Sequence, residues 1–291
     1  MLAEFIQFLF SGITIGSIYA LAALGFGIIY NASGVINFAQ GEFIMLGGMS
    51  AVVLAAAGLP LPLAILLAVA VVAVVGLLLE KLAIEPARNA DIVALIIITI
   101  GASLVLRGLV QVLFGKNTRA LPAFSGDQAL QLLGATILPQ SLWVLGTTVV
   151  IVAALAWFFG RTRFGKGMLA TSYNRLAAQL VGINTRLILL GAFGLSAVLG
   201  AVGGILITPI TYTSYDAGIM LGLKGFVAAT VGGLGSGVGA IVGGLLLGIT
   251  EAMTAGYVSS AYKDAVAFVL ILLVLFFMPR GLFGAKVSER V

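Results

Sequence analysis

The chain has 291 residues, of which 61% are hydrophobic and only 9% are charged, with a formal net charge of +5. Such an apolar composition is typical of a protein whose surroundings are mostly lipid, and it excludes an ordinary soluble domain. Cysteine and histidine are both absent, which excludes disulfides, thiolate or imidazole metal sites, and nucleophilic sites built on Ser-His or Cys-His pairs. We predict no metal site.

The positive charges stand at the ends of apolar segments and in the loops between them. Lys and Arg are retained on the cytoplasmic side of membrane proteins, so orientation in the bilayer accounts for the net charge. We therefore predict no nucleic-acid partner, and membrane lipid as the main surroundings.

Apolar segments close to the roughly 20 residues that a helix needs to cross a bilayer follow one another along the chain. They lie at residues 5–30, 34–58, 61–84, 92–114, 141–160, 187–210, 219–234, 237–257 and 262–278. The predicted fold is an all-α, polytopic transmembrane helical bundle with about eight or nine membrane segments, in a single domain over residues 1–291.

The second segment is interrupted near its start. Residues 31–48 contain four glycines and the polar side chains Asn37, Gln40 and Glu42. Glycine at this density disfavours a continuous helix, so we predict a broken or re-entrant segment here. A charge such as Glu42 inside an apolar segment suggests either a cavity-lining role or a position at a helix terminus.

Two polar connections follow. Residues 80–91 form a short charged turn that includes Lys81, Glu85 and Arg88, and we predict that it lies in the cytoplasm. Residues 116–140 are longer and contain Pro122 and Pro139. We predict that this connection lies outside the cell and holds a small structured element.

Residues 161–186 form the most basic stretch of the chain and contain no acidic residue. Its basic residues are Arg161, Arg163, Lys166, Arg175 and Arg186. The positive-inside rule places this loop in the cytoplasm. Within it, residues 167–181 have a helical composition with a partial apolar stripe at Leu169, Leu176 and Leu180, which predicts one short helix outside the membrane.

The last third of the chain is again rich in glycine, with ten glycines between residues 222 and 248. We predict two short or broken helices that meet near Gly235. Interrupted segments in both halves of a chain are typical of a transporter built from an internal inverted repeat, whose unwound backbone lines a cavity.

Glycine pairs four residues apart suggest a different role, which is close helix packing. These pairs are Gly12 and Gly16, Gly200 and Gly204, and Gly244 and Gly248.

The charges beside the other apolar segments have simpler explanations. We expect Arg107 to pair with an interior carboxylate or to extend to the membrane surface. Asp216 and Lys224, and likewise Lys263 and Asp264, are expected to be anchors at the membrane interface. The residues after Pro279 are mostly basic, including Lys286, and predict a cytoplasmic carboxyl terminus.

The string LAAQLVG at residues 176–182 resembles the E-A-A-x-x-x-G signature of permeases from importers of the ATP-binding cassette (ABC) class, with Leu176 in place of the acid. In that class the alanines and the glycine let a cytoplasmic coupling helix dock closely on the ATPase. This chain has no G-x-x-x-x-G-K-[ST] string. Energy from ATP would therefore come from another subunit.

Further strings extend the resemblance over the whole chain: GSIYAL at 16–21, VINFAQGE at 35–42, LVGIN at 180–184, GGLGS at 232–236 and YKD at 262–264. Together they resemble the H-type permease subunit of ABC importers for branched-chain amino acids. The resemblance implies a multi-pass protein of the bacterial inner membrane that performs no covalent chemistry and binds no cofactor itself.

The implied partners are a second, M-type permease, two cytoplasmic ABC ATPase subunits that hold ATP and Mg, and a periplasmic substrate-binding protein. The implied coupling helix lies within residues 161–186. Its ATPase-coupling residues would be Asn174, Arg175, Leu176, Ala177, Ala178 and Gly182.

The substrate pathway is expected where the two interrupted segments meet, so that helix amino termini face the carboxylate of a zwitterionic substrate. Its candidate residues are Asn37, Gln40, Glu42, Gly233, Gly235 and Ser236. The family usually has histidine at Gln40 and commonly proline at Val238, so a proton-sensitive contact at the first position does not carry over.

Three alternatives stay open at this point. The chain could be an ABC permease for another small solute, such as urea, an amide or a sugar. An ion-coupled secondary transporter would need an intramembrane ion site, for which Glu42 and Glu251 are the candidate pair. An intramembrane enzyme is disfavoured, because the chain offers no histidine or cysteine.

Overall fold

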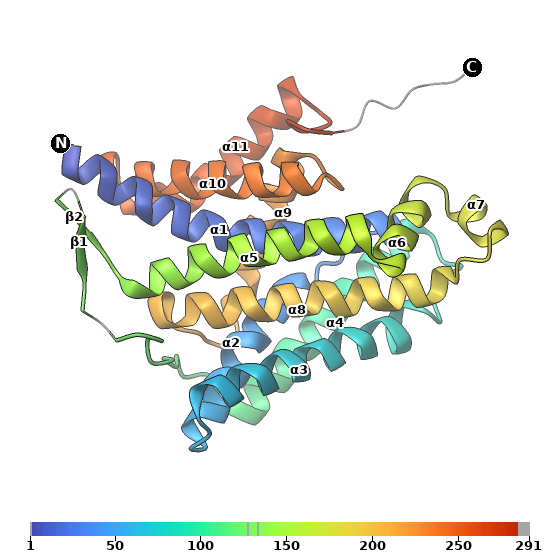
Figure 1. Ribbon diagram of the computed structural model, residues 1–291, viewed down its shortest axis with the longest axis horizontal. Coiled ribbons are helices and arrows are strands. Elements are labelled where there is room, and N and C mark those ends of the chain that lie inside the picture. The colour runs from blue at the N-terminus through green and yellow to red at the C-terminus, as the bar shows by residue number, and fades with distance from the viewer. Residues whose placement is uncertain (1, 127, 133, 285–291) are drawn as a thin grey trace.

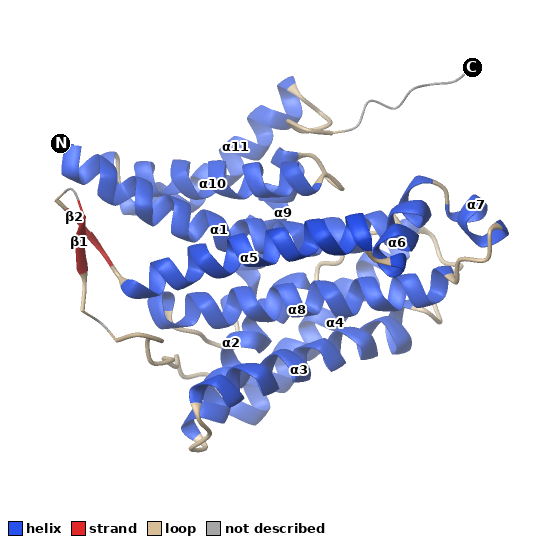
Figure 2. Cartoon of the chain, viewed as in Figure 1, coloured by secondary structure: helices blue, strands red, loops and turns tan. Residues whose placement is uncertain are grey.

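The computed structural model describes residues 2–126, 128–132 and 134–284. Helices make up most of this part, with one small hairpin at one end (Figure 2). The elements are α1 (Leu2–Ser33), α2 (Gln40–Ala56), α3 (Leu61–Leu79, continued by a π-helical turn Glu80–Ile84), α4 (Ile92–Phe114), β1 (Leu130–Leu132), β2 (Ala135–Ile137), α5 (Pro139–Arg161), α6 (Arg163–Tyr173), α7 (Arg175–Leu180), α8 (Thr185–Thr211), α9 (Ala217–Gly232), α10 (Gly237–Tyr257), a 3-10 turn (Ser260–Tyr262) and α11 (Lys263–Phe277).

The predicted all-α membrane bundle is confirmed, since each predicted apolar segment coincides over most of its length with one of these helices. Seven helices of the described part are long and apolar enough to cross a membrane when α3 is counted with its π-helical turn and α11 with the 3-10 turn before it. Helices α2 and α9 are shorter apolar helices of 17 and 16 residues. The chain is therefore a multi-pass membrane protein.

The bundle has an interior and a periphery. Helices α1 and α8 bury most of their residues, and α1, α5 and α8 run alongside one another in Figure 1. Helices α3, α4, α5 and α11 bury only a narrow stripe and expose Leu, Val, Ile and Phe side chains elsewhere. Phe26, Phe43 and Phe193 are among the largest side chains that are fully buried in the interior.

Helix α1 packs most extensively against α10, although they stand at opposite ends of the sequence. A Cβ atom at Gly16 would lie 2.9 Å from the carbonyl oxygen of Gly244, and one at Gly248 would lie 2.4 Å from the Cα atom of Gly16. The backbones can approach this closely only because both helices carry glycine there. The predicted packing role of these glycines is confirmed.

The predicted interruption at residues 31–48 was too long. The chain leaves the helical conformation only at residues 34–39, and α2 then runs without a break through Gly41, Gly47 and Gly48. A Cβ atom at Gly41 would lie 2.2 Å from the carbonyl oxygen of Gly218, and one at Gly47 would lie 2.4 Å from that of Ala201. These glycines bring α2 close to α9 and α8 rather than breaking the helix.

The second predicted break is where we expected it. Helix α9 ends at Gly232 and α10 begins at Gly237, and Gly233 and Gly235 have positive φ angles of 105° and 88° between them. The side chain of Ser236 accepts a hydrogen bond from the backbone N–H of Gly239 and starts α10. The internal inverted repeat stays a prediction.

The structured element predicted within residues 116–140 is the antiparallel hairpin β1–β2, which pairs Leu130 with Ile137 and Leu132 with Ala135. The side chain of Gln7 in α1 holds it through two hydrogen bonds with the backbone of Thr136, one donated and one accepted. The predicted orientation, with this end outside the cell, stays a prediction, and Lys286 in the predicted cytoplasmic tail lies outside the described residues.

Candidate functional site

The basic segment 161–186 holds two helices instead of the single helix predicted over residues 167–181. The chain is extended at Asn174, with φ −158° and ψ 104°, so α6 ends at Tyr173. The Asn174 side chain then accepts a hydrogen bond from the backbone N–H of Ala177 and begins α7. An asparagine that can cap a new helix is the physical reason for the break.

Helix α6 is packed into the bundle, whereas α7 stands at its far end, beyond α5 and α8 in Figure 1. Gly165 and Met168 of α6 are buried. Helix α7 is fixed by a 2.8 Å hydrogen bond from Gln179 Nε2 to Thr185 Oγ1. It ends at Leu180, and Gly182, which follows the C-cap residue Val181, has a φ of 87° where the chain turns toward α8.

The structure brings the six predicted coupling residues together in α7 and at its two ends, but they do not face the same way. The Ala178 side chain is on the buried side of α7 and is 3% exposed, while Ala177 and Gly182 are on the surface. Leu176, Leu180 and Val181 are 69%, 82% and 77% exposed. The outer face of α7 therefore presents apolar side chains, and its role in coupling stays a prediction.

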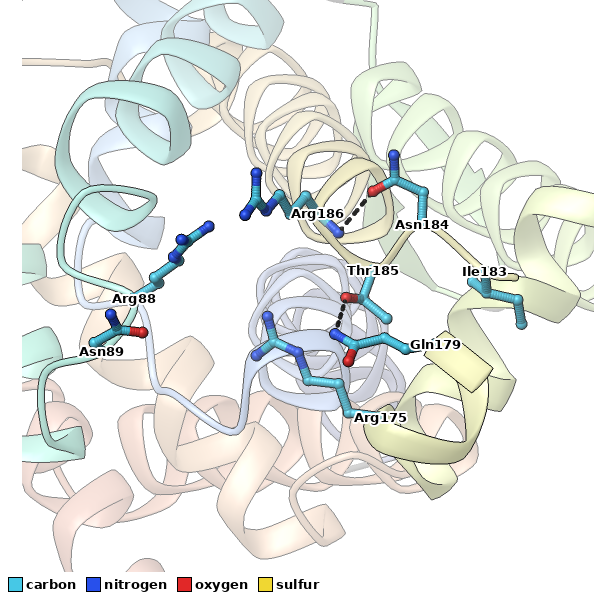
Figure 3. Close-up of a pocket in the computed structure, with 8 residues that line it drawn as sticks. All are labelled: Arg88, Asn89, Arg175, Gln179, Ile183, Asn184, Thr185 and Arg186. Carbon is cyan, nitrogen blue, oxygen red and sulfur yellow. Dashed lines mark hydrogen bonds between the residues drawn. The ribbon is translucent and has the colours of Figure 1, made fainter. Parts of the chain in front are cut away.

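A cavity of about 500 Å³ opens between α7, the beginning of α8 and the turn before α4. Figure 3 shows the guanidinium groups of Arg88, Arg175 and Arg186 turned toward this space from three segments of the chain. Sequence reasoning had placed these arginines in two separate loops. It had no means of showing that the loops meet.

The carboxylates closest in sequence to this cavity are engaged elsewhere. Glu85 pairs with Lys81 at 2.6 Å, and this hydrogen bond holds the pKa of Glu85 below its usual range. Asp91 accepts a hydrogen bond from the backbone N–H of Ala94 and caps α4.

The predicted pathway residues of the first break are buried inside the chain. Asn37 and Gln40 are 0% exposed. Gln40 donates a hydrogen bond through Nε2 to the backbone oxygen of Ser196, and the Ser196 hydroxyl donates to the carbonyl oxygen of Gly25 at 2.9 Å. Gln40 thus holds the start of α2 against α8 and α1.

Glu42 is also buried and pairs with α4. One of its oxygens, Oε1, accepts hydrogen bonds from Ser103 Oγ at 2.8 Å and from Arg107 at 3.0 Å. The other oxygen, Oε2, is buried without a hydrogen-bond partner in the described part of the chain. The prediction that Arg107 pairs with an interior carboxylate is confirmed.

The two breaks touch each other. Asn31, at the end of α1, donates a 2.8 Å hydrogen bond through Nδ2 to the backbone oxygen of Gly235. Beside this contact lies a second cavity of about 310 Å³, whose wall includes Asn31, Gly235 and Ser236 with apolar side chains of α1, α5, α6 and α10.

Of the six predicted pathway residues, Gly235 and Ser236 line this second cavity. Asn37, Gln40, Glu42 and Gly233 line neither of the two cavities. Gly233 instead packs against the backbone of Gly284, where a Cβ atom would lie 2.6 Å from the nitrogen.

Sequence reasoning missed a buried charge cluster, which we call the lysine cluster, formed by Lys224, Glu251, Asp264 and Tyr19. Lys224 Nζ lies 2.6 Å from both Glu251 Oε1 and Asp264 Oδ1. The Tyr19 hydroxyl donates a 2.8 Å hydrogen bond to Glu251 Oε2. The prediction that Lys224 is an interface anchor is wrong, since its side chain is only 7% exposed and paired.

A signal for this cluster was present in the sequence. A lysine within an apolar helix is costly unless it is paired, and Glu251 and Asp264 are carboxylates within or beside neighbouring apolar segments. The cluster joins α1, α9, α10 and α11.

Known proteins match this chain over nearly its full length. A family model described as the permease component of branched-chain amino acid transport systems matches residues 8–275. The high-affinity branched-chain amino acid transport system permease protein LivH of Escherichia coli is 34% identical over 302 residues, covering 99% of this chain and 98% of that protein. The corresponding permease protein BraD of Pseudomonas aeruginosa is 34% identical over 305 residues, with the same two shares.

A solved structure resembles the fold. A chain of PsaBC from Streptococcus pneumoniae in complex with Fab superposes with a TM-score of 0.53 at 16% identity, covering 96% of this chain and 97% of that one. At this identity the likeness shows the fold alone.

Proposed function

Because the chain belongs to the family of permease components of branched-chain amino acid transport systems, we propose that it is the membrane-spanning permease subunit of an ABC importer that carries branched-chain amino acids into the cell. The observation that carries this proposal is the 34% identity to LivH over 99% of the chain.

The partners and location follow from the same proposal. The permease lies in the bacterial inner membrane with its carboxyl terminus in the cytoplasm. A second permease subunit completes the pathway, two cytoplasmic ATPases hydrolyse ATP with Mg, and a periplasmic binding protein delivers the amino acid. The chain itself performs no covalent chemistry.

The geometry supports separate roles for the two ends of the bundle, with ATPase docking at the end that holds α7. Helix α7 is short, capped at both ends and exposes apolar side chains away from the bundle, as a docking element for an ATPase requires. Through Thr185 and α6 it is attached to α8 and α5, two helices that run the length of the bundle. Movement of the ATPases would therefore shift long helices as rigid bodies.

The contact between Asn31 and Gly235 marks the region where we propose that the substrate pathway lies. It joins the last turn of α1, just before the first break, to Gly235 within the second break. We propose that Asn37, Gln40, Glu42, Gly233, Gly235 and Ser236 control the pathway here. Gln40 and Glu42 would act by holding α2 in place, while Gly235 and Ser236 line the cavity beside it.

An ion-coupled mechanism finds less support. Its two candidate carboxylates, Glu42 and Glu251, each form an ion pair, with Arg107 and Lys224 respectively. Each of the two therefore has a cation as its partner, and neither is an isolated carboxylate of the kind that a coupling ion would neutralise.

The decisive experiment is uptake by the complete complex in proteoliposomes, with the binding protein outside and ATP supplied to the ATPase side. Radiolabelled leucine, valine, urea and ribose are tested side by side. We expect ATP-dependent accumulation of leucine and valine and none of urea or ribose. Uptake of urea or ribose without leucine would reassign the solute, and leucine uptake driven by an ion gradient without ATP would contradict the ABC mechanism.

A further inference from the structure

The cavity lined by Arg88, Arg175 and Arg186 is a concentration of positive charge. None of the three arginines forms an ion pair within residues 2–126, 128–132 and 134–284. Like charges gathered around one space repel one another, and an anion in that space relieves the repulsion. Guanidinium groups are also well suited to grip a carboxylate or phosphate through two parallel hydrogen bonds.

The chain supplies part of the compensating charge. Glu85 is close enough to Arg186 and Arg88 for their charges to help lower its pKa, but its hydrogen bond goes to Lys81, which does not line the cavity. Asp91 is held at the beginning of α4. Gln179 is fixed by its hydrogen bond to Thr185, while its remaining amide atoms and those of Asn89 and Asn184 border the cavity. The space thus combines three cationic groups with neutral hydrogen-bonding groups.

The surroundings distinguish between possible occupants. A lipid headgroup would need an apolar groove for its acyl chains, but Ile183 is the one apolar residue among those that line the cavity. On the outer side, however, the exposed Leu176, Leu180 and Val181 of α7 form an apolar border. Arginines beside exposed apolar side chains are the composition of a protein interface.

We infer that this cavity receives an acidic side chain, a glutamate or an aspartate, from the cytoplasmic ATPase subunit that docks on α7. This rests on the proposed function, because it assumes that an ATPase binds at this end of the bundle. The carboxylate would bridge Arg175 of α7 to Arg88 of the turn before α4 and to Arg186 at the beginning of α8. The ATPase would then hold three segments with one anchor, and its movement would reach α4 as well as α8.

The test measures binding of the purified ATPase subunits to the complete permease in nanodiscs of phosphatidylcholine, a lipid without net charge. The variants are Arg88→Gln, Arg175→Gln and Arg186→Gln, with Arg161→Gln and Arg163→Gln as matched controls. The controls remove the same charge from exposed positions of the same basic segment, outside the cavity. Thermal unfolding of each variant checks that the bundle is intact.

We expect each cavity variant to weaken ATPase binding roughly tenfold, because removing one partner of an interfacial charge pair speeds dissociation. Arg186→Glu should weaken binding further, because its carboxylate would repel the acidic anchor. The controls should bind within about twofold of the wild type, because charges outside the contact are screened by salt. Equal losses in cavity variants and controls would show general attraction between charged surfaces and overturn the inference.

Two further arms separate the remaining outcomes. If the cavity variants bind the ATPases normally but lose the thermal stabilisation that phosphatidylglycerol gives the wild type, the occupant is a lipid headgroup and the inference fails. Ala177→Trp places bulk on the outer face of α7 and should block docking altogether. Should Ala177→Trp abolish binding while the arginine variants do not, α7 docks an ATPase as proposed and only the acidic anchor is wrong. Failure of wild-type permease to bind any ATPase would overturn the proposed function instead.

Discussion

At the scale of single residues, two groups of charged side chains pair inside the bundle. Glu42 pairs with Arg107, and Lys224 pairs with Glu251 and Asp264. Each pair joins two different helices, such as α2 with α4. A buried pair contributes little net stability, but the loss of one partner leaves a buried charge uncompensated.

This difference gives a prediction for the lysine cluster. Lys224→Met keeps the aliphatic stem but leaves Glu251 and Asp264 facing each other, so we expect a loss of about 3 kcal/mol in the free energy of unfolding. The double variant Lys224→Met, Glu251→Gln removes the stranded charge and should recover part of that loss. Unfolding in mixed micelles, followed by circular dichroism, measures both.

The matched control for this prediction is Lys263→Met, since Lys263 is the neighbouring exposed lysine at the beginning of α11. It should unfold like the wild type. If Lys224→Met unfolds like Lys263→Met, the cluster is not a structural element of the bundle.

At the scale of elements, glycine determines which helices meet. The closest approach of α1 to α10 places Gly12, Gly16, Gly244 and Gly248 between the two backbones. Glycines within α4 and α5 have no such neighbours. A Cβ atom at Gly101 in α4 or at Gly146 in α5 would meet nothing within 4 Å.

We therefore expect opposite effects from the same substitution. Gly248→Ala drives a methyl group into the backbone of α1 and should destabilise the protein by roughly 2 kcal/mol or more. Gly146→Ala should be neutral or should stabilise α5 by up to about 1 kcal/mol, the difference in helix propensity. Melting temperatures of the two variants, purified in the same detergent, give the comparison. A Gly248→Ala variant that melts with or above Gly146→Ala would contradict the packing argument.

The sequence predicted where the helices lie but not which face of each helix is buried, for one physical reason. In a membrane bundle both lipid-facing and core-facing side chains are apolar, so the apolar pattern marks a segment without showing which side turns inward. The ranges of α3, α4 and α10 could thus be predicted, while the burial of Gln40 could not. The glycines of α2 were misleading because glycine serves both helix breaks and close packing, and only the neighbouring helices distinguish the two.

The candidate site likewise has a part that could be predicted from the sequence and a part that could not. The coupling residues are local in sequence, so the string at residues 176–182 was sufficient to predict a helix there, although the predicted helix of residues 167–181 did not separate α7 from α6. The cavity of Arg88, Arg175 and Arg186 depends on two loops meeting in space, which no local pattern reports. The break at Asn174 could have been predicted, because asparagine is a favoured residue at the start of a helix.

At the scale of the whole molecule, the two ends of the bundle differ in charge. The end with α7 carries the basic segment, while the opposite end carries the hairpin β1–β2 (Figure 1). The positive-inside rule places the α7 end in the cytoplasm. Since the chain has no cysteine, single cysteines can report this orientation without background.

We expect Gln128→Cys, in the connection before the hairpin, to react with a membrane-impermeant maleimide in intact cells. Lys166→Cys, an exposed position of α6, should react only after the cells are opened. Both positions in detergent serve as the control for accessibility. Labelling of Lys166→Cys but not of Gln128→Cys in intact cells would show the inverted orientation and remove the basis for ATPase coupling at α7.

The pairing of the first long helix with the tenth also has a consequence for biosynthesis. Tyr19 and Glu251 are 232 residues apart in the chain, and the ribosome needs about 10 to 50 s to make that length. During this time α1 is already in the bilayer, and its glycine face has no partner. The nascent permease is thus vulnerable to wrong helix contacts or to membrane proteases until translation is almost complete. A truncated chain that stops before α10 should be degraded rather than accumulate as a stable fragment.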